Sequence, residues 1–161
     1  MKALIIGAAG FVGSYLIDHL ISDCKWQVTA TKLEHEVIKS DKASIYNLDI
    51  LDKKSVVDLL RKSRPDYIFH LAAQSSVALS WKDPAFTVDV NIKGSINVLD
   101  AVRETGCNSR ILLIGSGEEY GHVLPDEIPV NESNSLKPNN IYAVTKVCQN
   151  LIGKIYSDAY N

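Results

Sequence analysis

A serine, a tyrosine and a lysine in the second half of the chain have the types and spacing of a site that reduces a carbonyl group. Tyr142 and Lys146 are four residues apart at the start of an expected helix, so they lie on one helical face. Ser116 follows an expected strand that ends at Ile114, at the carboxyl edge where doubly wound sheets bind ligands. Tyr142 would act as general acid towards the carbonyl oxygen, Lys146 would stabilise its phenolate, and Ser116 would donate a hydrogen bond to that oxygen.

The hydride for such a reaction would come from a dinucleotide held by the glycine loop near the amino terminus. Gly7, Gly10 and Gly13 follow an expected strand and open an expected helix, the context in which spaced glycines bind a pyrophosphate. Gly7 permits a tight turn, Gly10 lets the phosphates approach the backbone, and Gly13 lets the helix pack on the strand. The first N–H groups of this helix, at Phe11 and Val12, would bind the phosphates.

The residues after the second expected strand favour NADP over NAD. Lys32 stands where NAD sites usually carry an acid that grips the adenosine ribose, and the nearest carboxylate, Glu34, comes slightly later. A lysine there can meet the 2′-phosphate of NADP, and NAD remains the alternative. At the other end of the cofactor, Lys146 would bond the nicotinamide ribose beside Tyr142, so both residues also count as cofactor-binding.

Apolar runs alternate with helical patterns along the chain, which predicts an α/β fold with a doubly wound parallel sheet. We expect one NAD(P)-binding Rossmann domain over residues 1–161, with the strand order 3-2-1-4-5 of that fold. A loop at Val123–Asn140, rich in Pro, Asn, Glu and Ser, is a candidate substrate loop. The expected strands are Lys2–Ile6, Gln27–Thr31, Ser44–Tyr46, Asp66–His70 and Arg110–Ile114. The expected helices are Phe11–Ile21, Lys53–Lys62, Pro84–Glu104 and Tyr142–Tyr156.

Helical spacing predicts which side chains face the core. We expect the three cysteines to be small buried residues, and strand Arg110–Ile114 to present an open apolar edge. The expected inward positions are Val12, Leu16 and Leu20, then Val56, Leu59 and Leu60, then Val88, Ile92, Ile96, Leu99 and Val102, and finally Val144, Val147, Leu151 and Ile155.

Composition excludes several classes of protein. The chain has 161 residues, 22% of them charged, with a net charge of −2, so neither nucleic acid nor an anionic membrane surface is an expected partner. Its three cysteines are widely spaced, which predicts a reducing compartment and no metal site. No stretch reaches the roughly 18–20 apolar residues of a membrane span, and we expect a cytoplasmic protein.

With these motifs in this order, the chain resembles the extended short-chain dehydrogenase/reductases from Met1 to Asn161. These are NAD(P)-dependent epimerases, dehydratases and reductases of nucleotide sugars. The resemblance implies that Asp49 and Ile50 contact the adenine, that Leu71, Ala72 and Ala73 line the cofactor, and that Asn91 supports the backbone of the active site. It also implies a homodimer through the helices at Pro84–Glu104 and Tyr142–Tyr156.

The segment Ile114–Gly121 is similar to a Ser-Glu-Glu-Tyr-Gly run of GDP-4-keto-6-deoxy-mannose reductases and to the matching segment of GDP-mannose 4,6-dehydratases. Gly115 and Gly117 depart from the family, which usually has Ser, Ala or Thr there. Family members are also considerably longer, so we expect their C-terminal substrate-binding region to be absent from this chain, which would make it a truncated fragment or leave a partner to cover the open strand edge.

Three hypotheses follow from the resemblance. The first is a reductase of a 4-keto nucleotide sugar that consumes NAD(P)H. The second is a GDP-mannose 4,6-dehydratase or a related epimerase, in which Glu118 would remove the proton next to a newly formed ketone. The third is a non-catalytic NAD(P)-binding module or an inactive fragment, against which the presence of Ser116, Tyr142 and Lys146 together argues.

Overall fold

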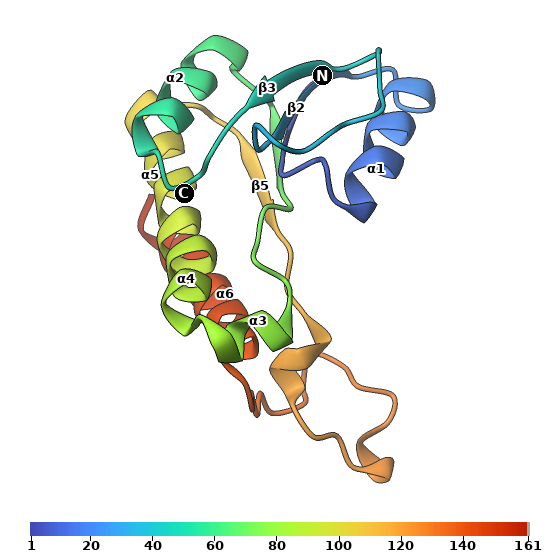
Figure 1. The fold of residues 1–161 in the computed structure, drawn as a ribbon, viewed down its shortest axis with the longest axis vertical. Coiled ribbons are helices and arrows are strands. Elements are labelled where there is room, and N and C mark those ends of the chain that lie inside the picture. The colour runs from blue at the N-terminus through green and yellow to red at the C-terminus, as the bar shows by residue number, and fades with distance from the viewer. Residues whose placement is uncertain (161) are drawn as a thin grey trace. The chain divides into compact units, whose positions relative to one another are not determined.

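The computed structural model describes residues 1–160, which fall into two compact units (Figure 1). The first unit comprises Met1–Ala73 and Gly94–Ile114. The second comprises Gln74–Lys93 and the described residues from Gly115 onward. The glycine loop therefore belongs to the first unit, and Ser116, Tyr142 and Lys146 belong to the second.

The first unit is built on a five-stranded parallel sheet in the order β3-β2-β1-β4-β5. Both the doubly wound fold and the strand order expected from the sequence are confirmed. A parallel sheet is buried on both faces, which is why Ala3 to Ile6 of the central strand are at most 2% exposed. The strands are β1 (Lys2–Ile6), β2 (Gln27–Lys32), β3 (Ser44–Asn47), β4 (Tyr67–His70) and β5 (Arg110–Leu113).

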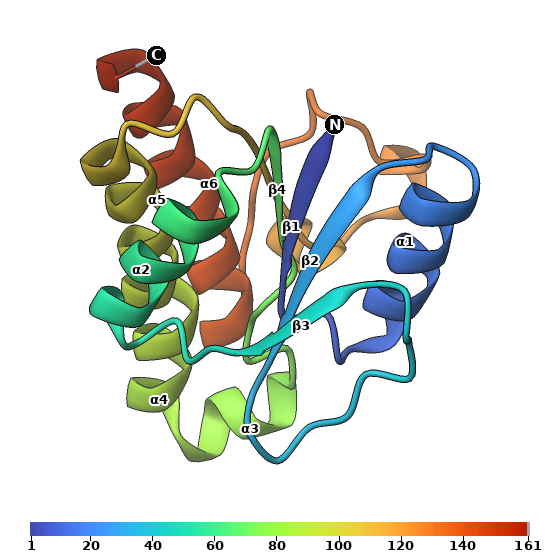
Figure 2. The same ribbon diagram turned by 90° about the horizontal axis from the view of Figure 1, so that it is seen from above.

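Three helices cover this sheet (Figure 2). Helix α1 (Phe11–Ser22) packs on one face, where Ile17 and Leu20 join Ile5 in a buried cluster. Helices α2 (Lys53–Ser63) and α5 (Gly94–Thr105) pack against each other on the opposite face. The inward positions expected for α2 are confirmed, but Val12 of α1 is 54% exposed. Gly13, one residue further on, is buried instead, and it packs against Ala8 of the glycine loop.

Strand β5 forms one end of the sheet, and its apolar side chains are partly uncovered. Leu112 is 50% exposed and Ile114, just after the strand, is 38% exposed. The expectation of an apolar edge at this strand is confirmed within residues 1–160.

The expectation of three buried cysteines is wrong for Cys24, which is exposed just after α1, whereas Cys107 is buried.

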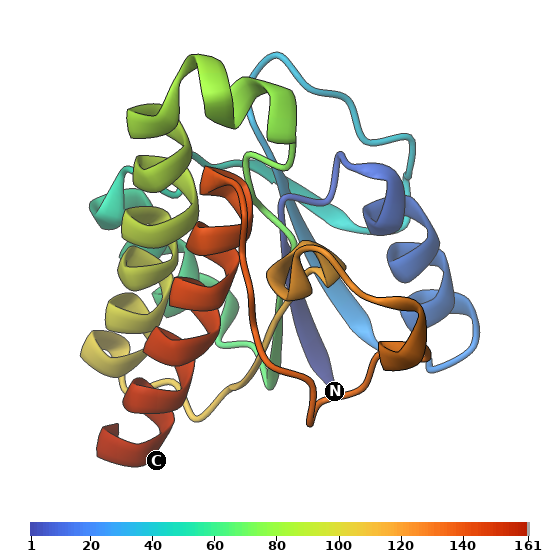
Figure 3. The same cartoon turned by 90° about the horizontal axis from the view of Figure 1, so that it is seen from below.

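The second unit is helical, with α3 (Val77–Lys82), α4 (Pro84–Val88) and the long α6 (Ile141–Tyr160) packed together. A π turn at Asp89–Lys93 joins α4 to α5, so the helix expected at Pro84–Glu104 is a continuous run from Pro84 to Thr105 with one widened turn. Between Gly121 and Asn140 the chain forms an open loop with a single 3₁₀ turn at Pro125–Glu127 (Figure 3). Helix α3 was not predicted; Ser76 caps its first turn.

The apolar face expected for α6 points outward. Val144 is 42% exposed, Leu151 is 55% exposed and Ile155 is 63% exposed. The buried positions of α6 are Tyr142, Ala143, Thr145, Lys146 and Gln149. In the preceding run, Val88 is 41% exposed, while the polar Thr87 and Asn91 are buried. Hydrophobic spacing predicts the wrong buried positions in these two segments because the polar side chains that face inward are paired by hydrogen bonds. These bonds offset the cost of burying polar groups.

Candidate functional site

The glycine loop has the geometry that the sequence predicts. Gly7 has φ +82°, and a Cβ there would lie 2.5 Å from the Cα of Ala72 and 2.6 Å from its nitrogen. At Gly13 a Cβ would overlap the carbonyl oxygen of Ala8 and lie 2.6 Å from its Cα. Side chains are thus excluded at Gly7 by the chain after β4 and at Gly13 by the loop itself.

Gly10 differs from the other two glycines because the space beside it is open. It is the N-cap of α1 in extended conformation, it makes no side-chain cap hydrogen bond, and the nearest atom to an added Cβ would be the carbonyl oxygen of Gly7 at 3.9 Å. The first N–H groups of an α-helix have no partner within the helix and attract anions. The start of α1 therefore fits a pyrophosphate.

Thr31, which was not predicted as a site residue, anchors this loop to β2. Its Oγ1 accepts from the Gly7 N–H at 3.1 Å and its carbonyl oxygen accepts from the Ala8 N–H at 2.7 Å. Thr31 is 1% exposed. The next residue, Lys32, donates from Nζ to the carbonyl oxygens of Leu33 at 3.1 Å and Glu34 at 3.2 Å. Lys32 is thus at the end of β2, directly after the residue that anchors the glycine loop, and its contact with a 2′-phosphate stays a prediction.

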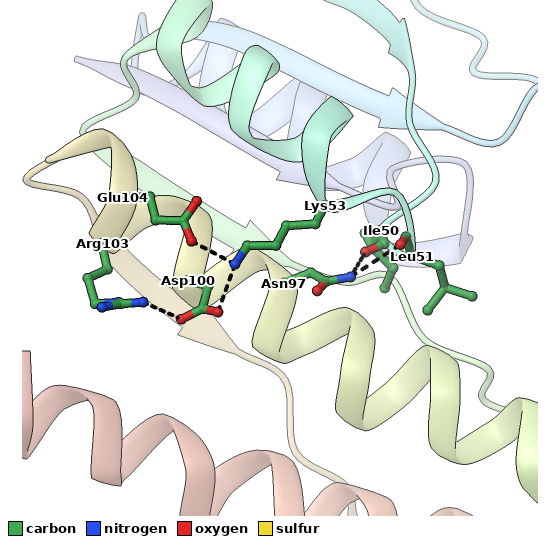
Figure 4. Close-up of polar contacts among 7 residues, drawn as sticks. All are labelled: Ile50, Leu51, Lys53, Asn97, Asp100, Arg103 and Glu104. Atoms are coloured by element: carbon green, nitrogen blue, oxygen red, sulfur yellow. Dashed lines mark hydrogen bonds and ion pairs between the residues drawn. The ribbon is translucent and has the colours of Figure 1, made fainter.

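The turn that follows β3 is held by α5 (Figure 4). Asn97 Nδ2 donates to the carbonyl oxygen of Ile50 at 2.9 Å and to that of Leu51 at 3.4 Å. The side chain of Ile50 packs against Gly94, where an added Cβ would lie 2.5 Å from its Cδ1. Asp49 is exposed and accepts from the Leu51 N–H at 2.9 Å. Asp49 and Ile50 are therefore fixed in place by α5, and their contact with an adenine stays a prediction.

Beside this turn, charged side chains connect α2 to α5 (Figure 4). Lys53 Nζ lies 2.6 Å from Glu104 Oε1 and 3.0 Å from Asp100 Oδ2, and Arg103 bonds Asp100 at 3.2 Å. The hydrogen bonds to Glu104 and Asp100 raise the pKa of Lys53. These side chains are partly buried, at 19% to 45% exposure, and they support the pairing of α2 with α5.

In the second unit, Ser116 starts the 3₁₀ turn Gly117–Tyr120 and caps it. Its Oγ accepts from the Glu118 N–H at 3.2 Å, and its own N–H donates to Glu119 Oε1 at 2.7 Å. Accepting a bond uses a lone pair of the hydroxyl, whose hydrogen is a separate donor. Glu118 is exposed and its Oε2 accepts from Asn140 Nδ2 at 2.9 Å.

Tyr142 and Lys146 lie on the inner face of α6, at 9% and 3% exposure. Asn140 caps the helix by accepting from the Ala143 N–H at 2.8 Å, so one amide joins Glu118 to the turn that presents Tyr142. Lys146 Nζ donates to Gln149 Oε1 at 2.9 Å. Burial lowers the pKa of Lys146, and the charge of Glu119 opposes this shift.

Asn91, in the π turn, ties three segments of the second unit together. Its Oδ1 accepts from the Gln74 N–H at 2.8 Å, and its Nδ2 donates to the Gln74 carbonyl at 3.0 Å and to Thr145 Oγ1 at 2.9 Å. Thr145 in turn donates to the carbonyl of Tyr142 at 2.7 Å. Asn91 therefore supports the backbone that carries the tyrosine, as the family resemblance implies. Asn140, Thr145 and Asn150 were not predicted, because single amides and hydroxyls form no motif.

Across residues 1–160, no group of three or more His, Cys, Asp or Glu side chains could hold a metal ion. Nor is any helix in that range long and apolar enough to cross a membrane.

Three curated relatives cover most of this chain. The UDP-glucose 4-epimerase of Mycolicibacterium smegmatis is 34% identical, over 100% of this chain and 53% of its own length. The GDP-mannose 4,6-dehydratase of Yersinia enterocolitica is 31% identical, over 99% and 46%. The GDP-6-deoxy-D-mannose reductase of Pseudomonas aeruginosa is 31% identical, over 91% and 44%. The chain thus spans about half the length of the curated relatives it matches.

Two solved structures share the fold and contain the expected class of cofactor. The UDP-glucose 4-epimerase of Thermus thermophilus in complex with NAD aligns with a TM-score of 0.91 at 27% identity, over 99% of this chain and 52% of that one. The RMD protein of Pseudomonas aeruginosa in complex with NADPH aligns with a TM-score of 0.82 at 29% identity, over 99% and 50%. The family model described as GDP-mannose 4,6 dehydratase matches residues 4–161. The chain therefore belongs to the GDP-mannose 4,6-dehydratase family, within the extended short-chain dehydrogenase/reductases.

Proposed function

We propose that the protein binds NADPH and reduces the keto group of a 4-keto-6-deoxy nucleotide sugar. A relative named GDP-6-deoxy-D-mannose reductase supports a reductase of this class. The observation that carries the proposal is the buried Tyr142 and Lys146 pair on α6, one turn apart, on the same compact unit as the capped Ser116. The open N-cap at Gly10 and the excluded side chains at Gly7 and Gly13 support a bound dinucleotide.

Each residue of the second unit has one task in this reaction. The cofactor supplies the hydride when it is bound. Tyr142 gives its proton to the carbonyl oxygen as general acid. Lys146 stabilises the phenolate that remains by its positive charge and bonds the nicotinamide ribose. Ser116 donates its hydroxyl hydrogen to the oxygen on which negative charge develops.

NADP is the proposed form of the cofactor because of Lys32. Its ammonium lies at the end of β2 and bonds neutral backbone carbonyls, and it forms none of the salt bridges found among residues 1–160. An ammonium without a carboxylate partner keeps its attraction for a phosphate. The contact between Glu34 and Lys32 is made by the backbone carbonyl oxygen of Glu34 and not by its carboxylate.

A 4,6-dehydratase is the second candidate, and Glu118 is the observation that favours it. The Glu118 carboxylate is exposed, and Asn140, which bonds it, is neutral, so a substrate can reach the carboxylate oxygens. In a dehydratase Glu118 would remove the proton next to the ketone; in a reductase it would bond sugar hydroxyls.

One experiment separates the two candidates. GDP-mannose with NADP gives a 4-keto product without net NADPH if the protein is a dehydratase. A reductase leaves GDP-mannose unchanged and consumes NADPH only when a 4-keto-6-deoxy sugar nucleotide is supplied. If the protein binds NADPH but converts neither substrate, the result favours the non-catalytic module. Interconversion of UDP-glucose and UDP-galactose would favour an epimerase.

We also propose that the protein forms a homodimer through α4 and α6. Five apolar side chains on these helices are exposed, and exposed apolar side chains on neighbouring helices are typical of an interface between copies of a chain. They are Phe86, Val88, Val144, Leu151 and Ile155. Light scattering should show a dimer that Leu151→Glu converts to a monomer. A monomeric unmutated protein would refute this part of the proposal.

A further inference from the structure

Glu119 is a buried carboxylate that the proposed reaction does not use. It is 5% exposed, whereas its neighbour Glu118 is exposed. Moving a carboxylate out of water costs several kcal/mol unless it is well bonded. This cost of burial falls on the residue next to Glu118, a candidate catalytic residue, and the contacts of the Glu119 carboxylate indicate its role there.

The contacts of Glu119 join the Ser116 loop to α6. Oε1 accepts from the Ser116 N–H at 2.7 Å and from Asn150 Nδ2 at 3.1 Å, and Oε2 accepts from Asn150 Nδ2 at 2.9 Å. Glu118 bonds Asn140, just before the start of α6. Two adjacent glutamates therefore fasten one short turn to α6 at two points ten residues apart.

Gly115 makes this arrangement possible. A Cβ at position 115 would lie 2.9 Å from Glu119 Oε1 and 3.2 Å from Asn150 Nδ2. A side chain at position 115 would crowd both the Glu119 carboxylate and the Asn150 amide, whose hydrogen bonds form a clamp between the Ser116 loop and α6. The family usually has Ser, Ala or Thr at position 115. Glycine leaves room there for the buried Glu119 carboxylate, which gives this departure from the family a structural reason.

Glu119 also acts on Lys146 through its charge. Its carboxylate opposes the lowering of the pKa of Lys146 by burial. The pKa of Lys146 is set by two causes, burial and the charge of Glu119. Other charged groups also lie on the elements that pack against α6. Those other groups are Lys82 on α3, Asp83 before α4, Asp89 and Lys93 in the π turn, and Glu118 beside Glu119.

We propose that Glu119 is a positioning residue of the carbonyl site, which holds Ser116 against α6 through Asn150 and attracts the ammonium of Lys146 by its negative charge. The clamp itself is a property of this chain; its importance for turnover rests on the proposed function. Glu119 touches neither substrate nor cofactor in this role and acts through Ser116 and Lys146.

Two substitutions separate the hydrogen bonds from the charge. In Glu119→Gln the amide oxygen still accepts from the Ser116 N–H, and Asn150, turned over, can present its oxygen to the new NH₂ group. Only the charge is lost. In Glu119→Ala both the clamp and the charge are lost. Asp158→Asn, which neutralises an exposed carboxylate near the far end of α6, is the matched control.

The first measurement needs no turnover. With lysine side chains labelled for NMR, and Lys146 assigned by its loss in Lys146→Met, the titration of Lys146 should move to lower pH in Glu119→Gln and stay unchanged in Asp158→Asn. An unchanged Lys146 titration in Glu119→Gln would overturn the electrostatic half of the proposal, whether or not the protein proves to be a reductase.

The second measurement uses the pH profile of NADPH-dependent turnover. In Glu119→Gln the basic limb should move to lower pH, with the maximal rate nearly kept. In Glu119→Ala kcat should fall on the order of 10²-fold with little change in KM, which is the size expected when a hydrogen-bond donor to the developing oxyanion is displaced. An Ala variant with unchanged kcat would overturn the positioning role. Absence of turnover in the unmutated protein would instead count against the proposed function, and the NMR titration would still decide the electrostatic half of the proposal.

Discussion

Replacing Gly13 by alanine tests whether α1 touches the loop below it as closely as the structure shows. The new Cβ would lie 2.6 Å from the Cα of Ala8 and would overlap its carbonyl oxygen. Carbon atoms normally stay about 3.5–4.0 Å apart, so α1 must withdraw by roughly 1 Å. Both colliding groups are backbone, and neither can turn away as a side chain would.

The expected loss of stability follows from two opposing effects. Overpacking of this kind costs about 1–3 kcal/mol, and the upper end applies because Ile17 and Leu20 of the same helix lose contact when it moves. Alanine in place of glycine within a helix returns about 1 kcal/mol. The net loss should be about 2 kcal/mol, which changes the ratio of folded to unfolded protein roughly 30-fold.

Gly10→Ala is the matched control, because it adds the same methyl group three residues earlier. The backbone there is extended and the nearest atom would be 3.9 Å away, so the free energy of unfolding should change by less than about 0.5 kcal/mol. The methyl would instead occupy space that the phosphates need and weaken NADPH binding. Urea unfolding and NADPH titration of both variants measure the two effects. Equal stability of Gly13→Ala and Gly10→Ala would refute the reasoning.

Three further predictions concern other parts of the structure. Because burial lowers the pKa of Lys146 below 10.5, the folded protein binds fewer protons than the unfolded chain between the two values, and its free energy of unfolding should rise with pH there. Lys146→Met, which lacks the buried charge, should therefore be more stable at neutral pH by urea unfolding and inactive; a less stable variant would contradict this. Asn97→Leu leaves the carbonyls of Ile50 and Leu51 without their donor and should cost about 1–3 kcal/mol and weaken cofactor binding, whereas a change no larger than that of the surface variant Lys53→Met would count against it. Lys32→Ala should weaken NADPH binding on the order of tenfold and leave NADH binding unchanged, and an equal effect on both would remove the argument for NADP.

The sequence is informative where backbone constraints or an unbroken apolar run decide the structure. The glycines at 7 and 13 could be predicted because each leaves no room for a side chain, and the five strands because a parallel sheet is buried on both faces. Ser116, Tyr142 and Lys146 could be picked out because a reaction requires those types in that order.

The remaining site residues could not be predicted, because their importance lies in pairings between distant positions. Thr145 bonds Asn91, 54 residues earlier in the chain, and Asn150 bonds Glu119, 31 residues earlier. The same pairings explain why hydrophobic spacing misplaced the buried face of α6. Once Lys146 and Thr145 are bonded on the inner side, Leu151 and Ile155 must point outward.

The most direct test of the account compares the unmutated protein with Tyr142→Phe, using NADPH and a GDP-4-keto-6-deoxy sugar. The substitution removes one hydroxyl, which is the proposed proton donor, and keeps the ring that is buried on α6. The account predicts that both proteins bind NADPH equally well and that Tyr142→Phe loses turnover by at least about 10²-fold. Undiminished NADPH consumption by Tyr142→Phe, or none by the unmutated protein despite tight NADPH binding, would contradict it.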